Sequence, residues 1–241
     1  MKAMIFAAGI GSRLYPITSK KPKALVEVGG KTMLEHTIRH LKEYGAEAII
    51  INVHHFAGQI RQFIRQHDSF GMEIAFSDET GQLLDTGGGL KKACWFFSKK
   101  EPFIVHNVDV LSNLDLHQLY RFQNQQDALA TLAVRQRQSS RYLLFDTSNR
   151  LCGWENQKTG ETQLIRPAEN YKKFAFSGIQ VIHPDLFQLM PQNHVFSITQ
   201  TYLQAGSQHT IKAFPEENSW WFDIGTPENL QKARRFMNGS R

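Results

Sequence analysis

Cysteine and long apolar runs are what this sequence has least of. Its 241 residues contain two cysteines, Cys94 and Cys152, which suit neither a disulfide framework nor a cysteine metal site. We expect both to be small apolar side chains in the interior. No run approaches the ~20 apolar residues that cross a bilayer. A short apolar run leads into glycines at the N-terminus, without a long apolar segment and cleavage site, so we expect no signal peptide and a cytoplasmic location.

A strong excess of one charge is also missing. The formal net charge is +6 at pH 7, and the sequence has no block of Lys and Arg interleaved with aromatic residues that would indicate a nucleic-acid-binding surface. We therefore expect neither a nucleic-acid partner nor a membrane partner. A modest positive excess suits a protein that handles phosphorylated small molecules.

The N-terminal stretch, by contrast, is rich in chemistry. An apolar run from residue 2 predicts a buried strand, and small residues follow it directly. Such residues let successive backbone N–H groups face an anion. Two positively charged residues come next. Arg13 can bind two phosphate oxygens at once, and Lys23 is a point charge on a flexible side chain. The stretch predicts a polyphosphate site formed by Ala7, Ala8, Gly9, Gly11, Ser12, Arg13 and Lys23.

Two well-known phosphate motifs are absent from this stretch. The dinucleotide-binding fingerprint needs a third glycine where Leu14 stands. The phosphate-loop pattern that ends in Gly-Lys-Ser/Thr is also missing. A dinucleotide-dependent oxidoreductase is therefore disfavoured.

Hydrophobic periodicity predicts an α/β protein. Strands and helices alternate along the first third of the chain, which favours a parallel, doubly wound sheet with ligands at the carboxyl ends of its strands. Thr32 and Glu35 predict a capping box at the start of the first helix. The expected strands cover 2–6, 48–53, 73–76, 103–109, 128–134, 142–146, 151–154, 173–182 and 209–214. The expected helices cover about 33–44, 57–66, 90–97, 114–125, 184–190, 197–205 and 226–237.

A second glycine-rich stretch, Asp85-Thr86-Gly87-Gly88-Gly89, precedes the helix expected at about 90–97. Three consecutive glycines are costly in any regular element, so they indicate either a close approach of the backbone to a ligand or a flexible turn. Gly178 interrupts the strand expected at 173–182 and indicates another close approach.

Three motifs together resemble one protein family. Residues 7–18 read Ala-Ala-Gly-x-Gly-Ser-Arg-Leu-x-Pro-x-Thr, residues 21–25 read Lys-Pro-Lys-Ala-Leu, and residues 221–227 read Trp-x-Asp-Ile-Gly-Thr-Pro. This combination resembles the sugar-1-phosphate nucleotidyltransferases, which make nucleoside-diphosphate sugars. The Thr-Gly-Gly-Gly segment looks most like the small bacterial N-acetylmuramate-1-phosphate uridylyltransferases, and mannose-1-phosphate guanylyltransferases are the other similar group.

The resemblance implies a role for each matched residue. Arg13 and Lys23 would be the catalytic residues, with Arg13 at the departing phosphates and Lys23 at the reacting ones. The N-terminal small residues, with Thr86, Gly87 and Gly88, would bind nucleotide. Asp109 and Asp223 would hold Mg²⁺. The expected sugar contacts are Asp85, Asn107 and Gly178.

The family's usual Glu-Lys-Pro motif is missing from residues 135–172, where Glu155 and Glu169 are both open as substitutes. Val108 stands where many relatives have glycine.

The resemblance also implies a fold: a Rossmann-like three-layer α/β sandwich with a central mixed, mostly parallel sheet. It would form a single domain over residues 1–241, with a nucleotide-binding part at about 1–110 and a sugar-binding part at about 111–241. Because the chain ends soon after the last motif, we expect no added β-helix. We expect a monomer or a small homo-oligomer.

The implied activity is nucleotidyl transfer from a nucleoside triphosphate to a sugar-1-phosphate, with release of pyrophosphate and Mg²⁺ as cofactor. UTP with an N-acetylmuramate-type sugar is the first expectation. A guanylyltransferase for mannose- or heptose-1-phosphate and a phosphocholine cytidylyltransferase stay open, as does a catalytically silent regulatory relative.

Overall fold

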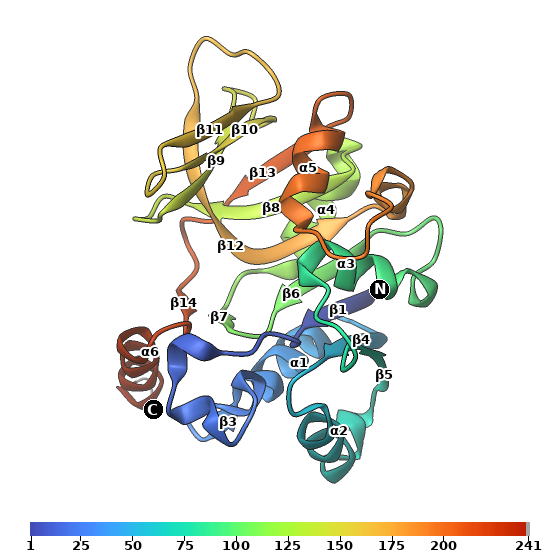
Figure 1. Cartoon of the computed structure of the whole chain (residues 1–241), viewed down its shortest axis with the longest axis vertical. Coiled ribbons are helices and arrows are strands. Elements are labelled where there is room, and N and C mark those ends of the chain that lie inside the picture. The colour runs from blue at the N-terminus through green and yellow to red at the C-terminus, as the bar shows by residue number, and fades with distance from the viewer. Residues whose placement is uncertain (240–241) are drawn as a thin grey trace. The chain divides into compact units, whose positions relative to one another are not determined.

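The computed structural model describes residues 1–239 and divides the chain into two compact units (Figure 1). Unit 1 comprises residues 1–83, 105–114 and the described residues from Ser219 to Gly239. Unit 2 comprises residues 84–104 and 115–218. The division expected near residue 110 stays a prediction. Unit 1 takes in a C-terminal segment that the order of the motifs does not place there.

Unit 1 is built on three parallel strands. They are β1 (Lys2–Phe6), β4 (Ala48–Val53) and β5 (Glu73–Asp78), side by side in Figure 1. Ile51 of β4 pairs with Ile5 on one side and Phe76 on the other. All six residues of β4 are buried, which is typical of a parallel strand covered on both faces. The expected β-α-β-α-β order is confirmed.

Helices in unit 1 begin where the sequence predicts them. Thr32 caps the first helix, because its hydroxyl accepts the Glu35 N–H at 3.1 Å. Two short strands, β2 (Glu27–Val28) and β3 (Lys31–Thr32), precede that helix. The helices of unit 1 are α1 (Met33–Glu43), α2 (Ala57–Gln66) and α6 (Pro227–Gly239). Single turns of 3₁₀ helix cover Ser12–Leu14, Ile17–Ser19, Lys23–Leu25 and Asp68–Gly71.

A second, two-stranded sheet joins distant segments within unit 1. Strand β6 (Phe103–Asn107) is followed by β7 (Val110–Ser112), which pairs antiparallel with β14 (Trp221–Asp223). An apolar cluster packs beneath this pair and ties it to the N-terminal loop and α6. Its buried members are Leu14, Val26, Val28, Met33, Leu111, Ile224, Leu230 and Ala233.

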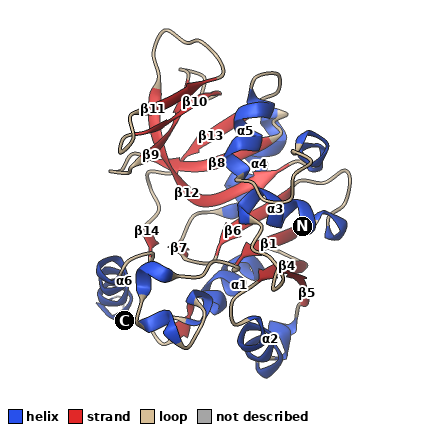
Figure 2. Ribbon diagram, viewed as in Figure 1, coloured by secondary structure: helices blue, strands red, loops and turns tan. Residues whose placement is uncertain are grey.

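Unit 2 contains a mixed sheet with strand order β11-β10-β9-β12-β8-β13. The β8–β13 pair is parallel and the other pairs are antiparallel (Figure 2). The strands are β8 (Ala130–Arg135), β9 (Arg141–Phe145), β10 (Leu151–Asn156), β11 (Glu161–Leu164), β12 (Lys172–Ile182) and β13 (Ile211–Pro215). The expected α/β class with a mixed sheet is confirmed.

Two helices cover opposite faces of this sheet, α4 (Leu116–Gln126) and α5 (Ile198–Gly206). The Thr131 hydroxyl on β8 donates to Gln123 of α4 at 2.6 Å. Its neighbour Leu132 lines a pocket together with residues of α5. Because adjacent residues of a strand point to opposite faces, the two helices lie on opposite sides.

Two expectations for unit 2 are wrong. The helix expected at 90–97 is α3 (Asp85–Lys92), so the glycines lie inside it, and a 3₁₀ turn at Cys94–Phe96 follows. Cys94 is exposed, whereas Cys152 is buried as expected; both are free thiols. The short helix expected at about 184–190 is confirmed as a 3₁₀ helix, Pro184–Leu189. Among the helices of residues 1–239, none is both long and apolar enough to cross a membrane.

Candidate active site

The loop after β1 is held by an asparagine on the neighbouring strand. Asn52 of β4 accepts the backbone N–H groups of Ala7 at 2.7 Å and Ala8 at 3.3 Å. Its own amide donates to Glu79 at 2.8 Å, and both polar side chains are buried. A buried polar group persists in a core when it is hydrogen-bonded. Asn52 therefore fixes where the loop leaves the sheet.

This contact uses two N–H groups that the sequence assigns to the nucleotide. The assignment of Ala7 and Ala8 stays a prediction, now with their N–H groups bonded to Asn52. Sequence reasoning missed Asn52 and Glu79. A usable signal was present, since Asn52 is the one polar residue of an otherwise apolar strand.

The two loop glycines have different reasons to be glycine. Gly11 has a φ of +72°, and an added Cβ would lie 3.1 Å from Lys23 Cβ and 3.1 Å from Thr18 Cγ2. The Thr18 hydroxyl also donates to the Gly11 carbonyl at 2.9 Å. A Cβ on Gly9 would meet nothing within 4 Å. Gly11 is therefore required by the chain itself, whereas Gly9 leaves open space above the loop.

Lys23 and Asp109 form an ion pair across unit 1. A 3₁₀ turn, Lys23–Leu25, places Lys23, whose side chain is 10% exposed. Its ammonium contacts Oδ2 of Asp109, which follows β6 and is 25% exposed at its side chain. The carboxylate holds the ammonium at a fixed place near the carboxyl end of β6, where ligands bind in sheets of this kind.

Asp223 is brought to the same place by strand pairing. On β14 it lies opposite Val110 of β7, the residue after Asp109. The next residue, Ile224, donates its N–H to the Asp109 carbonyl at 3.0 Å. Two aspartates more than a hundred positions apart in the sequence are thus neighbours along one antiparallel pair.

Arg13 completes the cluster by lying against Gly225. A Cβ built on Gly225 would be 2.9 Å from Arg13 Nη2 and 2.7 Å from Asp223 Oδ1. The Gly225 N–H donates to that same Asp223 oxygen at 2.6 Å. Unit 1 therefore gathers two cations, Arg13 and Lys23, and two carboxylates, with Arg13 exposed to solvent.

The two carboxylates fit a hard divalent cation that brings other ligands with it. Among residues 1–239, no three His, Cys, Asp or Glu side chains are grouped to hold a metal by themselves. Mg²⁺ commonly takes one or two protein carboxylates and completes its octahedral shell with water and substrate phosphate. Asp109 and Asp223 match that donor set.

The second glycine-rich stretch, residues 85–89, packs closely against another segment of unit 2. The N–H groups of Gly87 and Gly88 donate to the Phe196 carbonyl at 2.9 and 3.2 Å. A Cβ on Gly87 would lie 2.4 Å from the Phe196 ring, and one on Gly88 would lie 2.0 Å from the His194 carbonyl. The close approach is made by the 194–196 segment. Contacts of Thr86, Gly87 and Gly88 with nucleotide stay a prediction.

The expected sugar contacts are divided between the units. Asn107 is half-buried in unit 1, and no hydrogen bond of its side-chain amide occurs within residues 1–239. Asp85 is exposed at the start of α3 in unit 2. Gly178 has a φ of +81° within a break in the β12–β8 register. Their roles stay predictions.

Of the two candidate glutamates, Glu155 has a partner. Its carboxylate pairs with Lys173 of β12 at 2.8 Å, and that hydrogen bond lowers the pKa of Glu155. Glu169 is exposed in the loop before β12. A glutamate and a lysine thus meet across two strands, although the sequence lacks the adjacent pair.

Known proteins with similar sequences include uridylyl- and guanylyltransferases that are named for sugar-1-phosphates. An N-acetylmuramate alpha-1-phosphate uridylyltransferase of Caulobacter vibrioides is 40% identical over 109 residues, 44% of this chain and 45% of that protein. A mannose-1-phosphate guanyltransferase of Yarrowia lipolytica is 28% identical over 95% of this chain and 62% of that protein. The alignments thus span less than two thirds of either relative.

A solved structure shows the fold, and a family-wide sequence comparison shows the family. A UDP-glucose pyrophosphorylase from Acinetobacter baumanii has the same fold, with a TM-score of 0.78 over 97% of this chain and 91% of that one at 19% identity. The sequence model of the nucleotidyl transferase family matches residues 2–239. Nearly the whole described chain is covered by that match, and the chain therefore belongs to the nucleotidyl transferase family.

Proposed function

We propose that this protein transfers a nucleotidyl group from a nucleoside triphosphate to a sugar-1-phosphate and releases pyrophosphate. The observation that carries the proposal is the cluster in unit 1, where Lys23 pairs with Asp109 and Arg13 lies against Gly225 beside Asp223. This set of charges occurs in a chain of the nucleotidyl transferase family.

The reaction that fits the cluster needs no general base. An oxygen of the sugar-1-phosphate attacks the α-phosphorus of the triphosphate, and the bond between that phosphorus and the bridging β-phosphate oxygen breaks as pyrophosphate leaves. The nucleophile is already ionised at neutral pH, because the second pKa of a phosphate monoester is near ~6. Catalysis then consists of positioning and charge stabilisation.

Each residue of the cluster has a role in that scheme. Lys23, held by Asp109, neutralises charge at the reacting phosphates. Arg13 is exposed and forked, which suits the departing β- and γ-phosphates. Asp109 and Asp223 would hold Mg²⁺, which supplies charge neutralisation at the phosphates when bound.

UTP and an N-acetylmuramate-type sugar phosphate are the substrates we propose first. Support comes from the 40% identity to a Caulobacter vibrioides protein named for that reaction. The Yarrowia lipolytica guanyltransferase, similar over 95% of this chain, favours GTP with mannose-1-phosphate as the second candidate.

Pyrophosphate release tests both candidates. UTP, dTTP, GTP and CTP are each combined with N-acetylmuramate-, glucose-, mannose- and heptose-1-phosphate, with Mg²⁺ present or chelated. Release with UTP and N-acetylmuramate-1-phosphate is the expected result. Release with GTP and mannose-1-phosphate supports the second candidate, and release with no pair contradicts the proposal.

The role of Lys23 is tested by Lys23→Ala. We expect turnover to fall by ~100-fold or more, the scale for removal of one group that stabilises the transition state. Lys20→Ala is the matched control, because Lys20 is a nearby exposed lysine, and it should keep normal turnover. Normal turnover in Lys23→Ala would contradict the assignment.

A further inference from the structure

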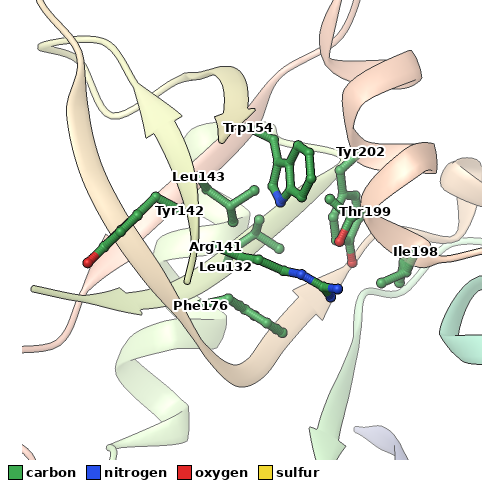
Figure 3. A pocket seen from close by; sticks show the side chains of 9 residues that line it. All are labelled: Leu132, Arg141, Tyr142, Leu143, Trp154, Phe176, Ile198, Thr199 and Tyr202. Atoms are coloured by element: carbon green, nitrogen blue, oxygen red, sulfur yellow. The ribbon is translucent and has the colours of Figure 1, made fainter. Parts of the chain in front are cut away.

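A pocket of about 190 Å³ lies within unit 2, outside the residues assigned above. Strands β8, β9, β10 and β12 and helix α5 line it. A buried cavity of ~150 Å³ holds a molecule as large as benzene, so this pocket has room for a small organic group. Figure 3 shows its side chains from close by.

One charged side chain lines this pocket, Arg141 of β9. Within residues 1–239, the Arg141 guanidinium makes neither an ion pair nor a hydrogen bond. Figure 3 shows the guanidinium on the same side of the pocket as the side-chain oxygens of Thr199 and Tyr202. Arg141 is exposed to solvent, so an anion can reach its guanidinium, which is a binding group for a planar anion such as a carboxylate.

The hydroxyl of Tyr202 is a second group that lacks a partner. Tyr202 of α5 is 2% exposed, and its hydroxyl has no hydrogen-bond partner in the described part of the chain. Burial raises the pKa of Tyr202 well above its usual value, so the hydroxyl keeps its proton and can donate. A buried hydroxyl that lacks a partner is costly, and a bound acceptor would relieve that cost.

Aromatic rings form the rest of the binding surface. Trp154 of β10 and Phe176 of β12 are both half-buried in the wall of the pocket. Their flat faces suit the C–H groups of a sugar ring or of a short carbon chain. The pocket therefore combines an apolar surface with the Arg141 cation and the hydroxyls of Thr199 and Tyr202.

The pocket adjoins the residues expected to contact the sugar within unit 2. Phe176 precedes Gly178 by two positions on β12. Ile198, which lines the pocket, donates its N–H to the Thr86 hydroxyl at 3.0 Å, and Thr86 follows Asp85 in α3. A sugar at Asp85 and Gly178 would therefore lie beside two residues, Phe176 and Ile198, that line this pocket together with Arg141.

We propose that this pocket receives a carboxylate-bearing substituent of the sugar and that Arg141 is the residue that selects for it. The inference rests on the proposed nucleotidyl transfer to an N-acetylmuramate-type sugar and adds the pocket and the residue that select for its acidic group. A carboxylate fits better than a second phosphate, because Arg141 is the single charged residue lining the pocket and a phosphate dianion calls for more than one cation.

The test compares two substrates that differ in the acidic group alone. N-acetylmuramate-1-phosphate carries a lactyl ether with a carboxylate, and N-acetylglucosamine-1-phosphate has a hydroxyl at that position. We expect Arg141→Met to lower kcat/KM for the acidic substrate ~10- to 100-fold, the scale for a lost hydrogen bond to a charged group. For the neutral substrate the change should stay below ~3-fold, and Arg141→Lys should recover part of the preference.

The control is Arg121→Met, which removes an exposed arginine from α4 and should leave both substrates unchanged. If Arg141→Met affects both substrates equally, or neither, the selective role of Arg141 is overturned while nucleotidyl transfer stands. A wild-type protein that uses neutral sugars alone overturns the acidic-sugar inference in the same way.

If no substrate pair reacts, the proposed nucleotidyl transfer fails. A binding measurement then tests the pocket by itself. Free N-acetylmuramic acid is titrated into the wild-type protein and Arg141→Met by calorimetry, with Trp154 fluorescence as a second readout. Binding that the substitution abolishes supports the acid-binding pocket. Absence of binding to the wild-type protein overturns it.

Discussion

In the unit 1 cluster, the side chains of Arg13 and Asp223 both lie against Gly225. The Gly225 N–H holds one oxygen of Asp223, and the guanidinium of Arg13 lies where a side chain at 225 would be. The absence of a Cβ at 225 is therefore what lets a cation and a carboxylate approach each other from distant parts of the chain.

This geometry predicts the effect of Gly225→Ala. The new methyl group would lie 2.9 Å from Arg13 Nη2 and 2.7 Å from Asp223 Oδ1. Both neighbours are ends of side chains that can move, so we expect small loss of stability but ~10- to 100-fold loss of kcat/KM, because a displaced charged group positions phosphate poorly. Pyrophosphate-release kinetics and a urea titration measure the two effects.

Gly58→Ala is the matched control for that substitution. Gly58 lies on α2, and a Cβ there would meet nothing within 4 Å. The change should raise stability by ~0.5–1 kcal/mol, as for glycine to alanine within a helix, and leave the kinetics unchanged. Equal kinetics for Gly225→Ala and the wild type would contradict the assigned contact.

At the scale of elements, strand β4 does more than fill the core. Asn52 links the loop after β1 to Glu79, just beyond β5, so one side chain sets the spacing of three parallel segments. Because the catalytic candidates Arg13 and Lys23 follow that loop, their positions depend on this buried link.

Asn52→Ala tests the link. The substitution leaves the N–H groups of Ala7 and Ala8 without their acceptor and Glu79 without its donor from Asn52. We expect a loss of ~1–3 kcal/mol in the free energy of unfolding, the usual penalty for buried polar groups that lose their partners. Urea denaturation followed by circular dichroism measures it.

The comparison variant for Asn52→Ala is Asn124→Ala, which changes an exposed residue of α4 and should stay within about 0.5 kcal/mol of the wild type. If Asn52→Ala proves as stable as Asn124→Ala, the hydrogen bonds of Asn52 do not contribute to the free energy of unfolding.

At the scale of the molecule, buried His106 and the half-buried His40 beside it couple stability to pH. His106 of β6 is 1% exposed, and its ring lies 5.9 Å from that of His40 on α1. Burial, and then the positive charge of His40, lower the pKa of His106 from 6.5 to about 3. A hydrogen bond to the Asn107 carbonyl and then the charge of Asp109 oppose the shift in part. Burial also lowers the pKa values of His40 and His36.

The sign of the pH effect follows from that shift. Below about pH 6.5 the unfolded chain binds protons at these histidines, whereas folded His106 stays neutral down to about pH 3. Acid therefore favours unfolding. The contribution of neutral His106 to the free energy of unfolding is complete above about pH 6.5. We expect the urea midpoint to fall between pH 7 and pH 4.5.

His106→Gln should make that fall shallower, because one shifted group no longer titrates. His209→Gln changes an exposed histidine and should leave the slope as in the wild type. An unchanged slope in His106→Gln would show that other groups carry the pH dependence.

The sequence by itself determined the local elements and the identity of the cluster. Capping at Thr32, strand 48–53 and helix 57–66 depend on residues close in the sequence, and so are read from it directly. Arg13, Lys23, Asp109 and Asp223 were identified through motifs, because their residue types suit phosphate and metal chemistry. Unit 1 places these four residues in one cluster.

The tertiary structure decided the contacts that form between segments far apart in the sequence. The glycines at 87 and 88 suggested a ligand or a flexible turn, yet their neighbours are His194 and Phe196, which no local pattern reveals. The same holds for Asn52 under the loop and for Arg141, an exposed residue at the start of β9 that lines a pocket together with residues of α5. Local propensity acts over a few residues, whereas packing brings together side chains whose separation in the sequence carries no signal.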